Sequence, residues 1–387
     1  MSDGGAEGAG EGGKKHERRK RYRGTHPRHF SEKYKEHRAA EYPEDIARIL
    51  ARGATPAGSH RPICVDEILA CLDPRPGETG VDATLGHGGH ARAFLSALAP
   101  GGRLYGFDRD ADELSRTAAL IDSELGRRGG AGGGAEGAAA GYDTASQAAI
   151  FIPVHASFAE LGEVLEEAGV GGVDFILADL GLSSMQIDDP ERGFSFKRRG
   201  PLDMRMDRSR GPSAAEWLAM VGEAELARAI RDNADESEAA AVARAICLRR
   251  GRLSTTRDLA EAICAAFPAL DFDDPGMRKI LTRIFQAIRI EVNGEFAALD
   301  ALLASIPSCL NPGGRVAILS FHSGEEGRVE RAFAAGLASG AYASVSAEAT
   351  RPSREERSAN PRSSSARLRW AVAPGERGSV AYGGIHG

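Results

Sequence analysis

The stretch that decides the fold is Asp82-Ala83-Thr84-Leu85-Gly86-His87-Gly88-Gly89-His90. An apolar segment of strand length, Gly80–Thr84, leads into it, and a helix is expected to follow at Ala91–Leu98. Glycines at such a junction let the backbone reach positive φ and approach a ligand closely. A Gly-rich turn between a strand and a helix is typical of sheets that bind a cofactor at the carboxyl ends of their strands.

Strands and helices alternate along the chain on both sides of this turn. Strands are predicted at Gly80–Thr84, Arg103–Phe107, Ala149–Val154, Val173–Ala178 and Arg315–Ser320. Helices are predicted at Ile63–Leu72, Ala91–Leu98, Ala111–Leu125, Leu161–Ala168 and Phe296–Ser305. This alternation predicts a doubly wound parallel α/β sheet. The run Asn311-Pro312-Gly313-Gly314 predicts a turn between the last helix and the last strand.

The pattern divides the chain into a sheet domain and a helical domain inserted in it. The sheet domain takes residues 59–186 and 293–387, and its second part includes a C-terminal tail. Helical periodicity dominates residues 187–292, with helices expected at Ala214–Ile230, Glu236–Arg250 and Thr256–Phe267. Residues 126–147 form a Gly/Ala tract with almost no large apolar side chain, which predicts a flexible surface insertion. Residues 1–58 are predicted to be a disordered start followed by a basic arm.

Charge is distributed unevenly along the chain. The formal net charge of −6 argues against a protein that coats nucleic acid without specificity. Basic stretches at 14–38, 192–210 and 351–369 nevertheless suggest a specific anionic partner, with a merely solvated surface as the alternative for each. No apolar run reaches the roughly 18–20 residues that a membrane span needs, so no membrane association is expected.

The five cysteines include no C-x-x-C pair and are odd in number. A reduced compartment, the cytoplasm, is the simplest interpretation. His87 and His90 are the only close pair of metal-ligand type near the glycine turn, and no cysteine joins them. The sequence therefore predicts no metal site.

Three acidic positions bear on the cofactor and the substrate. Asp108 closes the second strand about 20 residues after the glycine turn, where an acid accepts the ribose hydroxyls of NAD and S-adenosylmethionine alike. Gly86–Ala91 formally matches a dinucleotide pattern, but Asp82 suits the ammonium of a bound amino acid, and the two histidines crowd a pyrophosphate seat. These details favour S-adenosylmethionine. Asp179 opens the run Asp179-Leu180-Gly181-Leu182-Ser183-Ser184-Met185-Gln186, whose oxygens can accept hydrogen bonds from an aromatic amine.

Several stretches carry a resemblance to a known family: His60–Pro62 with Glu67, Asp82–His90, Asp179–Gln186, Asp188–Phe196, Gly200–Asp207, Phe285–Ile290, Ser320–Ser323, Asn360–Ser363 and Ala366–Arg369. Over about residues 60–370 the chain resembles the bacterial small-subunit (16S) ribosomal RNA cytosine-N4 methyltransferases of the RsmH (MraW) type. The run Gly200-Pro201-Leu202-Asp203-Met204-Arg205-Met206-Asp207 is highly specific. Three features depart from the family pattern: Gly324, where a bulky apolar residue is usual, the Gly/Ala insertion, and the long basic arm.

The resemblance implies a Rossmann-like class I methyltransferase fold, S-adenosylmethionine as cofactor, and a cytidine at the decoding centre of the small subunit as substrate. The cofactor contacts that it implies are Gly88, Gly89, His90, Asp108, Phe158, Asp179 and Gln186. Our hypothesis for catalysis is that Asp179, or carbonyls of its loop, holds the hydrogens of the reacting amine.

The residues expected to bind RNA lie mainly in the basic stretch of the inserted domain. Predicted phosphate contacts are Arg192, Lys197, Arg198 and Arg199, and Phe194 and Phe196 are candidates to stack on a base. His322 is either a substrate-side residue or a structural histidine. The expected partner is 16S ribosomal RNA or the small subunit, and the oligomeric state, a homodimer included, stays open. A NAD-dependent oxidoreductase and a non-catalytic RNA-binding assembly factor are the alternative functions.

Overall fold

The computed structural model describes residues 62–130 and 148–376. The predicted basic arm, the motif residues His60 and Arg61, and most of the Gly/Ala insertion lie outside the described residues. Within these two ranges, none of the helices combines the length and the apolar character that crossing a membrane requires.

Seven strands form one sheet in the order β3-β2-β1-β4-β5-β7-β6. Their bounds are Thr79–Asp82 (β1), Arg103–Asp108 (β2), Ile150–His155 (β3), Val173–Asp179 (β4), Leu310–Ser320 (β5), Ser344–Val345 (β6) and Arg367–Val372 (β7). Strands β1 to β5 pair in parallel, whereas β7 is antiparallel to both β5 and β6. The predicted parallel α/β sheet is confirmed, and the antiparallel pair at the C-terminal end adds an edge that the sequence patterns did not indicate.

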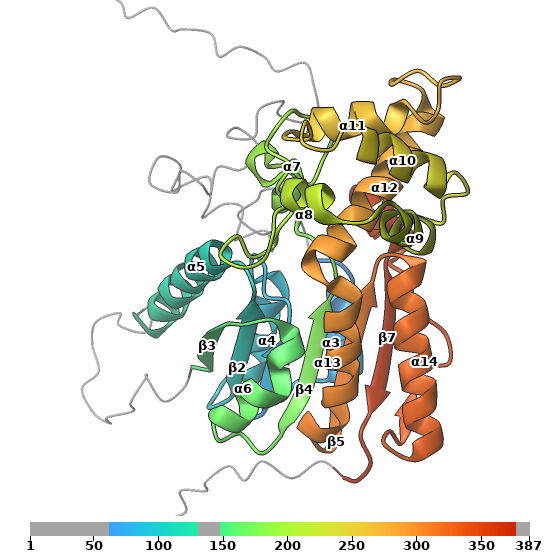
Figure 1. Cartoon of the computed structure of the whole chain (residues 1–387). Helices are drawn as coiled ribbons and strands as arrows, with labels where there is room; N and C mark the ends of the chain where they lie inside the picture. Colours follow the sequence, from blue (N-terminus) through green and yellow to red (C-terminus); the bar gives the residue numbers. More distant parts are fainter. Residues whose placement is uncertain (1–61, 131–147, 377–387) are drawn as a thin grey trace, which may run out of the picture.

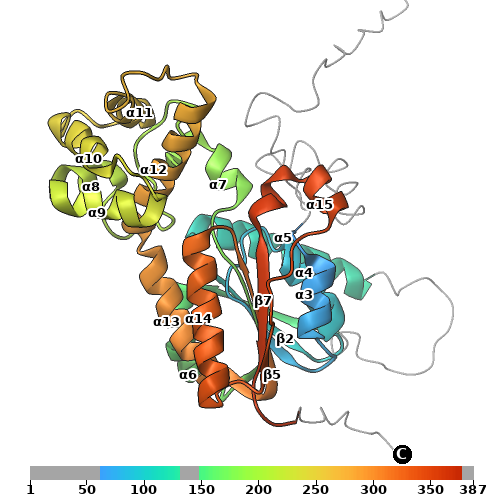
Figure 2. The same cartoon turned by 90° about the vertical axis from the view of Figure 1, so that its right-hand side faces the viewer.

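Helices cover both faces of this sheet, as Figures 1 and 2 show. One face packs against α3 (Val65–Leu72), α4 (Gly89–Leu98) and α5 (Ala111–Gly130). The other face packs against α6 (Leu161–Glu167), α13 (Glu295–Cys309) and α14 (Ser323–Ser339). Burial on both faces explains why the strands appear in the sequence as nearly continuous apolar runs.

Short elements connect the longer helices and strands. A 3-10 turn at Phe158–Glu160 precedes α6, and a second, Pro190–Arg192, follows α7 (Ser184–Asp188). Before β7, the chain forms α15 (Arg354–Ala359) and a 3-10 turn at Pro361–Ser365. Helix α5 continues through Gly130, so the first residues of the predicted flexible insertion are helical.

The inserted domain begins after α7 and has a core of its own, which extends from Phe194 to Ile288. Its helices are α8 (Ala214–Met220), α9 (Glu223–Ala234), α10 (Ala239–Leu248), α11 (Thr256–Cys264) and α12 (Pro275–Asn293). In Figure 1 this domain lies above the edge of the sheet at which the parallel strands end. Helix α12 returns the chain to the sheet domain through Gly294, whose φ of 59° turns it directly into α13.

Two predictions for the inserted domain were wrong. The single helix expected at Ala214–Ile230 is two helices, because Val221 takes an extended backbone and Gly222 is the N-cap of α9. Phe194, a candidate to stack on RNA, is 8% exposed and packs inside this domain, so it is not available to a base. Phe196 is partly buried, with its ring 5.5 Å from that of Phe285, and its stacking on a base stays a prediction.

The predicted turn at residues 311–314 lies within the bounds of β5. Val173 pairs with Leu310 and Phe175 with Arg315, so β5 uses five residues where β4 uses two. The extra residues interrupt the regular pairing of β5 with β4 and form the predicted turn.

A buried ion pair fixes the opposite edge of the sheet, away from the cofactor turn. The Arg315 guanidinium is 1% exposed and donates to both carboxylate oxygens of Glu78, at 3.0 and 2.8 Å. It also donates to the backbone carbonyls of Leu72, Asp73 and Asp174. Every donor direction of this side chain thus has an acceptor, which is the condition under which a buried charge is tolerated.

Candidate functional site

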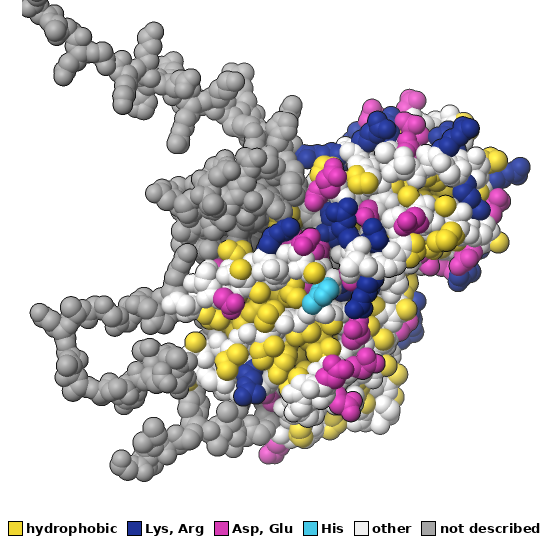
Figure 3. Space-filling model, turned by 60° about the vertical axis from the view of Figure 1, so that its left-hand side comes forward, with side chains coloured by type: hydrophobic (Ala, Val, Ile, Leu, Met, Phe, Trp, Pro, Cys, Tyr) yellow, Lys and Arg dark blue, Asp and Glu magenta, His cyan; other side chains and the backbone are white. Residues whose placement is uncertain are grey.

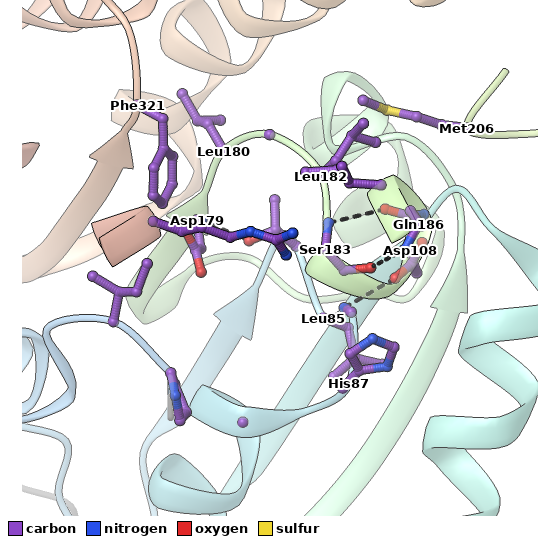
Figure 4. Close-up of a pocket in the computed structure, with 18 of the residues that line it drawn as sticks. Leu85, His87, Asp108, Asp179, Leu180, Leu182, Ser183, Gln186, Met206 and Phe321 are labelled. Atoms are coloured by element: carbon purple, nitrogen blue, oxygen red, sulfur yellow. Dashed lines mark hydrogen bonds between the residues drawn. The ribbon is translucent and has the colours of Figure 1, made fainter. Parts of the chain in front are cut away.

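A cavity of about 560 Å³ lies between the carboxyl ends of the strands and the inserted domain. Its volume falls in the roughly 300–1,000 Å³ range of small-molecule and cofactor sites. Residues from the ends of β1, β2 and β4 line it, together with residues of α7, α12 and the segment before β7. Figure 4 shows Asp179, Leu180 and Phe321 on one side of this cavity and Asp108, Ser183 and Gln186 on the other.

The glycine turn follows β1 and is held by the acid that closes β2. Gly86 and Gly88 have φ values of +48° and +68°, which glycine adopts without the penalty that a side chain would bring. The Asp108 carboxylate accepts hydrogen bonds from Gly86 N at 2.9 Å and from Asp110 N at 2.8 Å. Burial raises the pKa of Asp108 to about 6. Turn and acid therefore form one unit, with lone pairs of the carboxylate left for a ligand.

Asp179, at the end of β4, lies among buried acidic groups. Burial, together with the charges of Asp82 and Glu325, raises the pKa of Asp179 to about 8. Asp82 is 1% exposed, and its burial raises its own pKa to about 7. A cation placed beside these carboxyl groups would favour their ionised forms and bring the pKa values down.

His90 contacts Asp179 from the start of α4. Its Nε2 lies 3.0 Å from the carbonyl oxygen of Ile63, and its Nδ1 lies 3.7 Å from Asp179 Oδ2. Burial lowers the pKa of His90 to about 4, so the ring is neutral at physiological pH. With Nε2–H donating to Ile63, Nδ1 carries the lone pair that faces the Asp179 carboxyl group.

A second histidine lies on the side of α14. His322 is the N-cap residue of that helix, and its Nε2 lies 3.1 Å from Glu325 Oε1. Glu325 also accepts a hydrogen bond from Phe321 N at 2.8 Å, and the hydrogen bond and positive charge of His322 hold the pKa of this carboxyl below its usual range despite burial. His322, Phe321 and Glu325 all line the cavity.

The structure brings most of the predicted cofactor residues to this cavity: Gly89, His90, Asp108, Phe158, Asp179 and Gln186 all line it. Gly88 does not. A Cβ on Gly88 would lie 2.9 Å from Thr117 and 3.0 Å from Ile121, so this glycine faces α5. The side chain of Gln186 is occupied within the protein, because it accepts from Ser183 N and donates to Asp110. Direct cofactor contact by these residues stays a prediction.

The predicted RNA contacts separate into two groups. Lys197, Arg198 and Arg199 are exposed. Arg192 instead points inward: its guanidinium is 11% exposed, pairs with Asp110 and donates to the carbonyls of residues 205 and 206. These contacts within the protein account for an arginine at position 192, and no contact with RNA is needed to explain it. Figure 3 shows Lys and Arg side chains over the inserted domain, interspersed with acidic ones.

The lining residues without a role assigned from the sequence include five from segments far from the strand ends: Thr282, Gln286, Arg289, Asn360 and Arg362. The first three lie on α12, and the other two in the segment before β7. The stretches 285–290 and 360–363 did carry part of the family resemblance, which was the available signal. These residues are far in sequence from the strand ends, so the sequence alone did not indicate that they line the same cavity.

One group of potential metal ligands lies near α3, in the part of the chain that the structure describes. Ligand atoms of Cys64, Glu67 and Glu356 lie within 4.8 Å of one another. Glu356 already accepts a hydrogen bond from Cys64 N at 3.0 Å, and burial raises the pKa of the Cys64 thiol to about 12. A thiol that keeps its proton is a poor metal ligand.

The charges of the cavity suit a cationic cofactor. Its acidic lining residues are Asp108, Glu113, Asp179 and Glu325. Its arginines already have partners: Arg109 donates to the carbonyl of Asn293, Arg289 pairs with Glu295, and Arg362 pairs with Asp188. A pyrophosphate would meet carboxylates and, among the described lining residues, no free guanidinium to balance it, whereas an ammonium and a sulfonium would be stabilised.

The cavity also has the features that hold an adenosine. Asp108 stands at the end of β2, where ribose hydroxyls bind in sheets of this kind. Phe158 and Leu180 supply apolar surface for a ring. His87, another lining residue, has a buried Nε2 that no residue in the described ranges hydrogen-bonds. This fold and this site define an S-adenosylmethionine-dependent methyltransferase.

Comparison with known proteins identifies the family. The model of the MraW methylase family matches residues 57–127 and 139–373. Ribosomal RNA small subunit methyltransferase H 1 of Lachnoclostridium phytofermentans is 42% identical over 363 residues, which cover 92% of this chain and 93% of that protein. Ribosomal RNA small subunit methyltransferase H 2 of Alkaliphilus metalliredigens is 43% identical over 363 residues, with 92% and 98% covered. The chain belongs to the MraW methylase family.

Two solved structures illustrate the distant structural resemblance. TrmN from Thermus thermophilus matches 80% of this chain and 48% of its own at 14% identity, with a TM-score of 0.34. Fibrillarin from Aeropyrum pernix, solved with natively bound S-adenosyl-L-methionine, matches 79% and 74% at 11% identity, with a TM-score of 0.30. These TM-scores are too low to carry any argument about the site.

Proposed function

We propose that this protein transfers a methyl group from S-adenosylmethionine to the N4 amine of a cytidine in 16S ribosomal RNA, at the decoding centre of the small subunit. The names of the relatives support a small-subunit RNA substrate. The observation that carries the proposal is the position of Asp179, in the wall of a cavity that the sheet and the inserted domain enclose together. A cofactor on the sheet side and a base on the domain side would meet at this carboxyl group.

The chemical task of the protein is mainly one of placement. When bound, the cofactor supplies a methyl group on a sulfonium, which is already a reactive donor. The amine of cytosine is a weak nucleophile, because its lone pair is delocalised into the ring, and it must lie in line about 3 Å from the methyl carbon. We infer that the Asp179 carboxylate accepts one N4–H hydrogen bond and thereby orients the amine. Phe321 and Leu180 would exclude water from the reacting atoms.

Access to the cavity requires the target base to leave its stack. We propose that Lys197, Arg198 and Arg199, which are exposed on the inserted domain, bind phosphates beside the target. His322 lies in the same cavity as Asp179 and stays a substrate-side candidate, held in place by Glu325. The 16S RNA, as naked RNA or within the small subunit, is the proposed partner, and the cytoplasm the proposed location.

A non-catalytic assembly factor is the second candidate function. A protein that only binds RNA has no need of acids at the ends of β2 and β4 or of a turn that holds one of them, as Asp108 is held by Gly86. The match to a methylase family gives no support to the alternative of a NAD-dependent oxidoreductase.

Methyl transfer from labelled S-adenosylmethionine tests the proposal. Small subunits that lack the modification are incubated with the full-length protein, and the modified base is then mapped by mass spectrometry. We expect one labelled N4-methylcytidine with the intact protein and none with Asp179→Asn. Label on another base, or none with any small-subunit substrate, would reject the proposed substrate.

A further inference from the structure

The inserted domain contributes one helix face to the cavity. Thr282, Gln286 and Arg289 of α12 line it, and their spacing of four and then three residues puts them on one side of the helix. None of α8 to α11 supplies a lining residue. This face of α12 is therefore the surface that the helical part of the inserted domain offers to a molecule in the cavity.

Two of these three side chains already have hydrogen-bond partners. Thr282 Oγ1 donates to the carbonyl of Arg278 at 2.8 Å. The Arg289 guanidinium donates to both carboxylate oxygens of Glu295, at 2.7 and 2.8 Å. Gln286 differs, because no residue within 62–130 or 148–376 forms a hydrogen bond with its half-buried amide. Its carbonyl oxygen and its NH₂ group are both available to a ligand.

Gln286 lines the cavity from the inserted domain, on the same face of α12 as Arg289. Arg289, one turn further along α12, is close enough to Glu325 for the two charges to interact, and Glu325 in turn raises the pKa of Asp179. Gln286, Arg289, Glu325 and Asp179 all line this one cavity, so a base inside it can contact both Gln286 and Asp179. Of the expected adenosine contacts, Asp108 is the last residue of β2, and Phe158 follows β3.

We propose that Gln286 reads the Watson–Crick edge of the target cytosine, opposite Asp179. Enzymes that act on an extruded base recognise it by hydrogen bonds to this edge. Cytosine presents the N4 amine, a donor, beside N3, an acceptor, and a primary amide presents the complementary acceptor and donor. Gln286 Oε1 accepts one N4–H, Nε2 donates to N3, and the second N4–H remains for Asp179. This assignment rests on the proposed function and specifies how its substrate is recognised.

The pair of side chains would also distinguish cytosine from uracil. Uracil presents O4, an acceptor, in place of the amine, and an N3–H donor in place of the bare N3. The amide of Gln286 can rotate by about 180° to match that pattern. The Asp179 carboxylate cannot adapt, because its oxygen and O4 of uracil are both acceptors and would face each other. Selection for cytosine therefore requires both residues: Gln286 fixes the orientation of the ring, and Asp179 then accepts the remaining N4–H.

Substitution of Gln286 tests the assignment in single-turnover methyl transfer to small subunits at saturating cofactor. Gln286→Met keeps the length of the side chain and removes both hydrogen bonds, so kcat/KM for the RNA is expected to fall about tenfold to a hundredfold. The Kd for S-adenosylmethionine, measured by calorimetry, is expected to stay within about twofold. Asn233→Leu is the matched control, since it removes an amide of the same domain that bonds Glu291 of α12 outside the cavity.

A second variant makes the test independent of folding. Gln286→Glu keeps the acceptor at all pH values but donates to N3 only when the carboxyl group is protonated. The activity of this variant relative to wild type should therefore rise as the pH is lowered. A Met variant as active as wild type, a loss of cofactor affinity that matches the loss of activity, or a Glu variant with a flat activity ratio would each overturn the assignment. If the wild-type protein modifies no cytidine at all, the proposed function itself fails.

Discussion

Replacement of Asp179 by Asn should make the cofactor-free protein more stable at alkaline pH while it abolishes methyl transfer. Burial raises the pKa of this carboxyl from the ordinary value of 3.8 to about 8. Between these values the folded protein keeps a proton that the unfolded chain releases, so the free energy of unfolding falls as the pH rises and levels off above about pH 8. An amide does not titrate, so the variant escapes this loss.

The size of the effect follows from the pKa shift. Each pH unit within the window costs at most about 1.4 kcal/mol, so the interval from about pH 5.5 to about pH 8 has a ceiling of roughly 3.4 kcal/mol. Asp82 lies nearby with its pKa raised to about 7, so the two carboxyl groups share the cost of ionisation. The Asp179 side chain is also 26% exposed to the cavity, where water screens its charge. We therefore expect a gain of about 1–2 kcal/mol for the variant over that interval.

Urea unfolding at both pH values measures this gain as the change in the difference between the variant and wild type. Asp122→Asn is the matched control, because Asp122 is an exposed aspartate on α5. The same preparations are then assayed for methyl transfer, which should be lost in Asp179→Asn only. A stability difference that does not change with pH would refute the claim that Asp179 is protonated in the folded protein. Retained turnover would refute its role in holding the amine.

Three further substitutions probe other parts of the structure. Asp108→Asn removes one carboxylate oxygen that holds Gly86 or Asp110 and should weaken S-adenosylmethionine binding by about tenfold or more in calorimetry; an unchanged Kd would separate Asp108 from the cofactor. Glu78→Gln leaves the buried Arg315 charge without its counter-ion and should cost about 3–5 kcal/mol in urea unfolding, and a cost below about 1 kcal/mol would contradict the ion-pair account. The double change Lys197→Ala and Arg199→Ala should reduce the salt slope of RNA binding by about 1–2, whereas an identical slope would exclude both as phosphate contacts.

The sequence predicted the sheet well because the relevant signals are local. A strand buried on both faces is a short apolar run, as in Val173–Asp179, and the turns beside it contain glycine. The carboxyl ends of parallel strands share one edge, so the positions of Asp108 and Asp179 at the ends of two strands were enough to assign both acids to one site. The break at Val221 was missed because an apolar residue and a glycine also fit a helical period.

The remainder of the site depends on contacts between distant segments. Arg362 reaches the cavity through a hydrogen bond to Asp188, 174 residues away, and no periodicity encodes that distance. Gln286 appears in the sequence as one polar position on an amphipathic helix. Only the position of α12 beside the carboxyl ends of the strands makes it part of the cavity wall. Basic residues are ambiguous for a similar reason: Arg192 and Arg199 look alike in sequence, but one is paired with Asp110 and the other is exposed.

The pairing of Arg192 has a consequence for how the two domains act together. Asp110 follows the predicted ribose acid by two residues, and its carboxylate is fixed by Arg192 of the inserted domain. Arg109, between the two acids, donates to the carbonyl of Asn293 at the end of α12, the helix that carries Gln286. The loop that would hold the cofactor is thus bonded to both ends of the inserted domain. If α12 moves to bring Gln286 toward a base, the Asp108 loop must move with it or these hydrogen bonds must break, so we expect binding of the cofactor and of the RNA to be coupled.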